Sequence, residues 1–69
     1  MTMKVGENIR RKRLEYDIEQ KELAQRIGIN RTQLCNIERG RRRPSVDVVY
    51  KIADTLHCSV DELLGRSVG

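Results

Sequence analysis

The chain has no Trp, no Phe and only two Tyr among 69 residues, so a core must come from Ile, Leu, Val and Ala. Two Cys are too few for the disulfide framework of small secreted domains, and they are too far apart in sequence to form a metal-binding cysteine pair. No apolar run approaches the length of a membrane span, and no apolar signal segment opens the chain. We therefore expect a cytoplasmic protein with reduced thiols and no membrane partner.

Residue types that carry catalysis are also sparse. His57 and Cys58 are adjacent and Cys35 lies far from them, without a zinc-protease motif, a phosphate-binding glycine loop or a carboxylate pair. We therefore expect no enzyme, no catalytic residue, no metal, no cofactor and no small-molecule ligand. A thiol sensor at Cys35 is an alternative that only the nearby arginines favour.

Charge is unevenly distributed along the chain. Residues 1–43 carry 12 Lys or Arg and 6 Asp or Glu, whereas residues 44–69 carry 2 and 4. The basic residues gather in two runs, at positions 10–13 and 39–43. A basic pole of this kind favours a polyanionic partner, although basic runs on protein surfaces are often only solvated.

Apolar residues recur at helical spacing, period-2 alternation is absent, and Pro44 is the only proline. The pattern predicts an all-α fold of five helices: residues 5–16, 20–27, about 31–39, a helix opened by Pro44-Ser45, and a short one after Ser59. Gly28 and Gly40 are expected to end helices, and Asn30, Ser45 and the Ser59–Glu62 capping box to begin them. The predicted core side chains are Val5, Ile9, Tyr16, Leu23, Ala24, Ile27, Leu34, Ile37, Val46, Val49, Ile52, Ala53 and Leu56, and the short last helix contains Val60, Leu63 and Leu64.

The third predicted helix has one apolar side and one nitrogen-rich side. Leu34 and Ile37 share the inner side, Gln33 lies on the flank, and the outer arc holds Arg31, Thr32, Cys35, Asn36 and Arg39. Guanidinium groups suit guanine, carboxamides suit adenine, and the Thr methyl suits the thymine methyl. A solvated helix face would use the same residue types. No acidic residue interrupts this arc, however, and that favours a DNA-facing surface.

Residues 5–64 resemble the DNA-binding domain of the phage lambda repressor and Cro superfamily, the Xre-type helix-turn-helix family. The resemblance is carried by Ile18, Gln20, Glu22-Leu23-Ala24, Ile27-Gly28-Ile29, Leu34, Ile37-Glu38-Arg39-Gly40, Pro44-Ser45, Lys51-Ile52-Ala53, Leu56 and Ser59-Val60-Asp61-Glu62-Leu63-Leu64. It implies a compact five-helix domain over residues 1–69, with a core at about 5–64 and short tails.

The resemblance also implies roles for matched positions. The positions that match base-reading residues are Arg31, Thr32 and Asn36, with Gln33 less often involved. The positions that match phosphate-contacting residues are Gln20, Arg39, Arg41, Arg42 and Arg43. Arg13 and Glu38 match a buried ion pair that ties the first helix to the third, and two unrelated surface charges are the less favoured alternative.

Four positions depart from the family pattern. Glu19 stands where Ser or Thr usually caps the second helix. Lys12 lies on the core side of the first helix, where we expect its stem to pack while its amine reaches water, and Leu14 points outward. His57 replaces a Gly after the fourth helix, a position where His tolerates positive φ.

Together these features predict a sequence-specific regulator, more a repressor than an activator, that binds a palindromic operator in double-stranded DNA as a homodimer. Half-sites about one helical turn apart are expected. The self-association surface is predicted near the C-terminus, at Val48, Leu63, Leu64 and Val68. A protein-interaction module that keeps the fold, antitoxin-like or regulator-binding, is the alternative. The resemblance implies a nucleoid-associated protein from a prokaryote, phage or mobile element.

Overall fold

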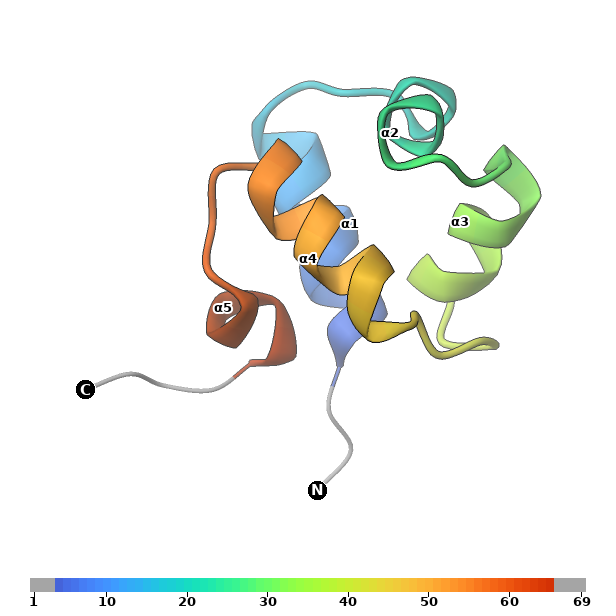
Figure 1. Cartoon of the computed structure of the whole chain (residues 1–69). Coiled ribbons are helices and arrows are strands. Elements are labelled where there is room, and N and C mark those ends of the chain that lie inside the picture. Colours follow the sequence, from blue (N-terminus) through green and yellow to red (C-terminus); the bar gives the residue numbers. More distant parts are fainter. Residues whose placement is uncertain (1–3, 66–69) are drawn as a thin grey trace.

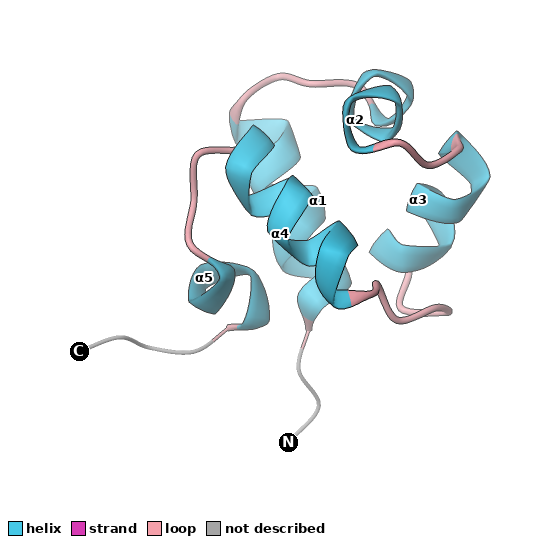
Figure 2. Cartoon of the chain, in the orientation of Figure 1, coloured by secondary structure: helices cyan, strands magenta, loops and turns pink. Residues whose placement is uncertain are grey.

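A computed structural model describes residues 4–65, which fold into five helices joined by short turns (Figure 1). The helices are α1 (Val5–Glu15), α2 (Gln20–Ile27), α3 (Arg31–Glu38), α4 (Val46–Thr55) and α5 (Val60–Leu64). The described residues contain no strand (Figure 2), and none of their helices is long and apolar enough to cross a membrane. The all-α, five-helix prediction is confirmed.

Local sequence explains where these helices begin. Asn30 caps α3 in a complete capping box: its side chain accepts from the Gln33 N–H at 2.8 Å, and Gln33 Oε1 accepts from the Asn30 N–H at 3.0 Å. Ser45 Oγ accepts from the Val48 N–H at 3.2 Å and so caps α4. The side chain of Glu19 makes no capping bond at α2, as its identity suggested.

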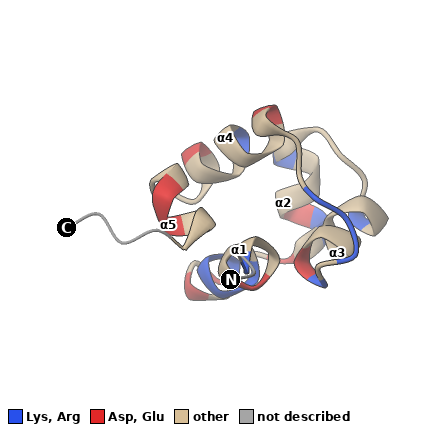
Figure 3. Cartoon of the chain, turned by 90° about the horizontal axis from the view of Figure 1, so that it is seen from below, with Lys and Arg blue, Asp and Glu red and all other residues tan. Residues whose placement is uncertain are grey.

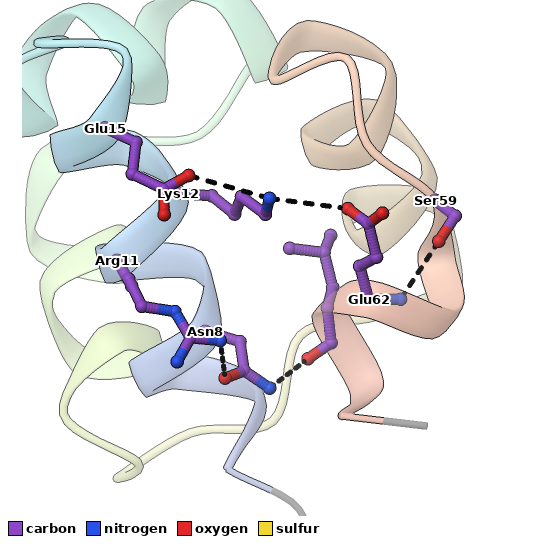
Figure 4. A network of polar contacts seen from close by, with 7 residues as sticks. Asn8, Arg11, Lys12, Glu15, Ser59 and Glu62 are labelled. Carbon is purple, nitrogen blue, oxygen red and sulfur yellow. Dashed lines mark hydrogen bonds and ion pairs between the residues drawn. The ribbon is translucent and has the colours of Figure 1, made fainter. Parts of the chain in front are cut away.

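The capping box predicted for α5 is only half present. Ser59 Oγ accepts from the Glu62 N–H at 3.1 Å, but the Glu62 carboxylate lies 3.5 Å from Lys12 Nζ instead of returning to the cap (Figure 4). The attraction of a cation on another helix therefore outcompetes the local bond. Lys12 is partly covered, and its amine reaches both Glu62 and Glu15.

Two positive-φ residues end helices where the sequence predicted them. Gly28 has φ 81° after α2, the left-handed conformation that glycine adopts at little cost. His57 has φ 51° after α4, so the His in place of the usual Gly is accommodated there.

Helix contacts form a closed ring around the core. α1 packs against α3 and α5, α2 packs against α3 and α4, and α4 packs against α5. Seen from below, the helices surround a common centre (Figure 3). Apolar side chains from all five fill that centre: Ile9, Leu23, Ala24, Ile27, Leu34, Ile37, Val49, Ile52, Ala53, Leu56 and Leu63.

Three predicted positions are wrong. Tyr16 and Val46 were expected in the core but are 47% and 70% exposed. Tyr16 follows the last turn of α1 and Val46 is the first residue of α4, so both project beyond the ends of the core. Leu63 was assigned to a self-association surface but is fully buried, because α5 packs against both α1 and α4. Val68, from the same predicted surface, lies outside the described residues.

An unexpected feature is the closeness of α1 to the end of α3. A Cβ added to Gly6 would lie 2.1 Å from the Ile37 carbonyl oxygen and 2.8 Å from that of Glu38. Only a residue without a side chain allows this approach. Gly6 therefore sets the distance between α1 and the helix that carries the candidate site.

Candidate nucleic-acid interface

α3 presents its polar arc outward because its apolar residues anchor it to the core. Leu34 and Ile37 are buried, and helical geometry then places the remaining positions away from the centre. Arg31, Thr32 and Arg39 are exposed, whereas Cys35 and Asn36 are half-buried. The predicted arc is thus one continuous surface, most accessible at its two ends.

Gln33 lies on the flank of that surface and has a structural task. Its Oε1 atom holds the Asn30 N–H in the capping box, which fixes the first turn of α3. The Nε2 group has no hydrogen bond to the described residues, so it keeps two donors on a side chain whose oxygen atom is held in place.

A buried ionic cluster joins α1, α2 and α3. Arg13 Nε donates to Glu38 Oε2 at 2.8 Å and its Nη2 to Oε1 at 3.1 Å, while its Nη1 donates to the Ile18 carbonyl at 2.8 Å. The Glu38 side chain is 1% exposed and that of Arg13 is 9% exposed. The ion pair implied by the resemblance is therefore present, and it is bidentate.

Gln20 is the third member of this cluster, and its contact with Glu38 was not predicted from the sequence. Its Nε2 donates to Glu38 Oε1 at 3.0 Å. Gln20 is the first residue of α2 and Glu38 the last of α3, so no local spacing could have paired them. The bond uses one amide hydrogen, and the second one has no acceptor within residues 4–65.

An open groove of about 860 Å³ runs between α1 and α3 above this cluster. Gly6, Arg10 and Arg13 line its α1 side, and Arg31, Cys35 and Arg39 line its α3 side. Gln20, where α2 begins, lines it as well.

Beyond the groove, the chain leaves α3 through a basic turn. The Arg41 N–H donates to the Asn36 carbonyl at 2.9 Å, which ties the turn to the end of α3. Arg41, Arg42 and Arg43 are all exposed. The turn therefore continues the positive surface toward α4.

Positive charge gathers on this side of the molecule. Figure 3 shows Lys and Arg on α1, on α3 and along the turn after α3, while Asp and Glu occur on all five helices. Among residues 4–65, no acidic group lies within ion-pair distance of the six basic residues of this face: Arg10, Arg31, Arg39, Arg41, Arg42 and Arg43. Cations elsewhere are often neutralised, as Arg26 is by Glu22 at 2.6 Å. The positive charge of these six residues is thus not neutralised by ion pairs within the described residues.

Other chemically reactive side chains lie away from this face. His57 makes an edge-on contact with Tyr16, with ring centroids 6.2 Å apart. Burial raises the pKa of the Cys58 thiol, and Glu62 adds to that rise, which makes the thiol less reactive. In the part of the chain that the structure describes, no three His, Cys, Asp or Glu side chains gather as a metal site would require.

The sequence and the fold have close counterparts among known proteins. A family model described as helix-turn-helix matches residues 9–63. The transcriptional repressor RstR of the cryptic phage CTXphi of Vibrio cholerae is 38% identical over 64 residues, which make up 93% of this chain and 57% of that protein. An uncharacterised helix-turn-helix transcriptional regulator, y4dJ of Sinorhizobium fredii, is 40% identical over 60 residues, or 87% of this chain and 78% of that protein.

A solved structure agrees with these sequence relatives. The c2 repressor of phage P22, crystallised with a synthetic operator, superposes with a TM-score of 0.86 at 27% identity, covering 97% of this chain and all of that one. The same arrangement of helices thus occurs in a repressor in complex with a synthetic operator.

Proposed function

This chain belongs to the lambda-repressor-like helix-turn-helix family, and we propose that it represses transcription by binding a specific site on double-stranded DNA. The observation that carries the proposal is the outer arc of α3, which is polar, free of acidic residues and held outward by Leu34 and Ile37. An α-helix with such an arc fits the major groove.

Within that arc, we assign base reading to Arg31, Thr32, Gln33 and Asn36. Arg31 is exposed at the start of α3, and the N-terminal residues of a recognition helix reach base edges. Its guanidinium suits the O6 and N7 atoms of guanine, and the Asn36 amide suits adenine. The free Nε2 group of Gln33 would donate to an acceptor at the edge of the site.

Phosphate contacts would fix the register of α3 in the groove. We assign them to Gln20, Arg39, Arg41, Arg42 and Arg43. Gln20 supports this role because its amide is held by the buried Glu38 carboxylate and keeps one hydrogen free. Because the Glu19 side chain leaves the first turn of α2 uncapped, backbone N–H groups there are also free to meet a phosphate.

A single α3 contacts few base pairs, so we propose that two copies bind one palindromic operator with half-sites about one helical turn apart. We propose that the two copies contact each other through the surface near α5 and the C-terminus. Val48 and Leu64, both half-buried, remain its apolar members in the described residues. Such a regulator would act on the nucleoid, in the cytoplasm of a prokaryotic host.

Selection of bound duplexes from a random library would test the proposal and yield the half-site sequence. Fluorescence anisotropy would then compare Arg31→Ala and Asn36→Ala with Lys51→Ala, a cation on α4 outside the proposed site. Each of the first two variants should lose about 1–3 kcal/mol on the selected site and discriminate less at one base pair. Lys51→Ala should bind as the parent does. Equal losses on selected and random DNA would exclude base reading by that residue.

Dimeric binding has a separate test. Analytical ultracentrifugation of the protein with a short duplex should give two protomers per selected site. One protomer per duplex at saturation would contradict the palindromic arrangement.

A further inference from the structure

The basic face includes one residue on α1 to which the proposed function gives no role. Gly6, Arg10 and Arg13 follow one another at spacings of four and three residues, which places them on one side of a helix. Gly6 lies against the last carbonyls of α3 and Arg13 pairs with Glu38. The side of α1 that carries Arg10 therefore faces α3, with Arg31 and Arg39 across the groove.

The cations of α1 are divided between two sides of the helix. Lys12 lies 3.6 Å from Glu15 and 3.5 Å from Glu62, and Arg11 Nη2 donates to Asn8 Oδ1 at 3.0 Å. Figure 4 shows these contacts along the α5 side of α1. Together with the Asn8 bond to the Leu63 carbonyl, they belong to the packing of α5.

Arg10 differs from these neighbours. It is exposed, and within residues 4–65 it has no hydrogen bond from its side chain and no carboxylate within 4.0 Å. Glu7 also lines the groove, but its carboxylate lies 4.0 Å from Lys4 Nζ. Arg10 stands at the rim of the groove, since it also borders the adjoining hollow with Arg11.

We propose that Arg10 donates to a backbone phosphate of the bound DNA, so that the contact surface crosses the groove from α3 to α1. This inference rests on the proposed function. A guanidinium presents two parallel N–H groups to a phosphate. The groove is open and continuous with the α3 arc, so a DNA strand lying along Arg31 and Arg39 brings a phosphate to the opposite rim. Arg10 then adds affinity and register, with no preference for base sequence.

Arg10→Ala and Arg11→Ala form a matched pair, since both remove one charge from exposed neighbouring positions of the same helix. Affinity would be measured by anisotropy over a range of salt concentrations, with the selected site and with random duplex. Arg10→Ala should weaken both DNAs by the same factor and reduce the log–log salt slope by about 0.9. Arg11→Ala should keep the parent slope, and Arg10→Lys should restore most of it.

Phosphate ethylation interference gives a second readout, which reports the position of the contacted phosphates rather than the overall affinity of a variant. Ethylation of one phosphate per half-site should block binding of the parent protein. The same ethylation should leave binding of Arg10→Ala unaffected. Equal slopes for Arg10→Ala and Arg11→Ala, or identical interference patterns for the parent and Arg10→Ala, would overturn the inference while leaving the proposed function intact. Failure of the parent to bind any duplex would instead remove the proposed function, and the Arg10 contact with it.

Discussion

For the substitution Gly6→Ala, helix propensity and packing predict changes in folding stability of opposite sign. Gly6 is the second residue of α1, and alanine in a helix interior is favoured over glycine by about 0.5–1 kcal/mol. Helix propensity alone therefore predicts a more stable protein. The contact with α3 predicts the reverse, because the new Cβ would lie 2.1 Å from the Ile37 carbonyl oxygen and 2.8 Å from that of Glu38.

The contact should win. Both clashing atoms belong to the backbone, so no side-chain rotation relieves them, and α1 must move away from α3. Overpacking of this kind costs about 1–3 kcal/mol, and the movement also strains the Arg13–Glu38 pair. Because both atoms belong to the backbone, we expect a cost in the upper half of that range, so the net loss after the gain in helix propensity is about 1–2.5 kcal/mol. For a domain of this size, each kcal/mol lowers Tm by about 4–8 °C.

Thermal and urea unfolding, followed by circular dichroism at 222 nm, would measure the effect. Glu7→Ala is the control, because it places the same side chain at the next, exposed position of α1; its effect should stay within about 0.5 kcal/mol. A Gly6→Ala protein as stable as the parent, or more stable, would refute the packing argument.

Three further outcomes follow from the structure. Glu38→Ala leaves the buried Arg13 guanidinium unpaired and should cost about 3–5 kcal/mol in urea unfolding, whereas Arg13→Met with Glu38→Leu should cost less; equal losses would argue against a desolvation penalty. Glu19→Ser should supply the missing cap of α2 and stabilise the fold by about 0.5–1 kcal/mol, and no change in Tm would show that serine does not cap there. Because burial and Glu62 raise the pKa of the Cys58 thiol, iodoacetamide at pH 8 should modify it more slowly in the folded protein than in urea, as followed by mass spectrometry; equal rates would contradict this. The same rise means that the thiol holds its proton more tightly when folded, so its contribution to stability is complete below the unfolded pKa and is lost as pH rises through the folded one.

The sequence alone determined the local features of the chain. Helical spacing predicted the helices, and Asn30, Ser45 and Gly28 marked their ends, because a cap bonds within three residues and a left-handed turn depends on a single residue. The sequence also predicted the outward arc of α3, since Leu34 and Ile37 fix which side of that helix is buried. The resemblance, rather than any spacing, paired Arg13 with Glu38.

Only the tertiary structure decided where the core ends and which distant residues meet. Periodicity assigns a side of a helix but not the extent of its neighbours, so Tyr16 and Val46 were placed inside and Leu63 outside. The contacts of Gly6 with the end of α3 and of Gln20 with Glu38 join segments far apart in sequence. Such pairs depend on how whole helices pack, and no short window of residues encodes them.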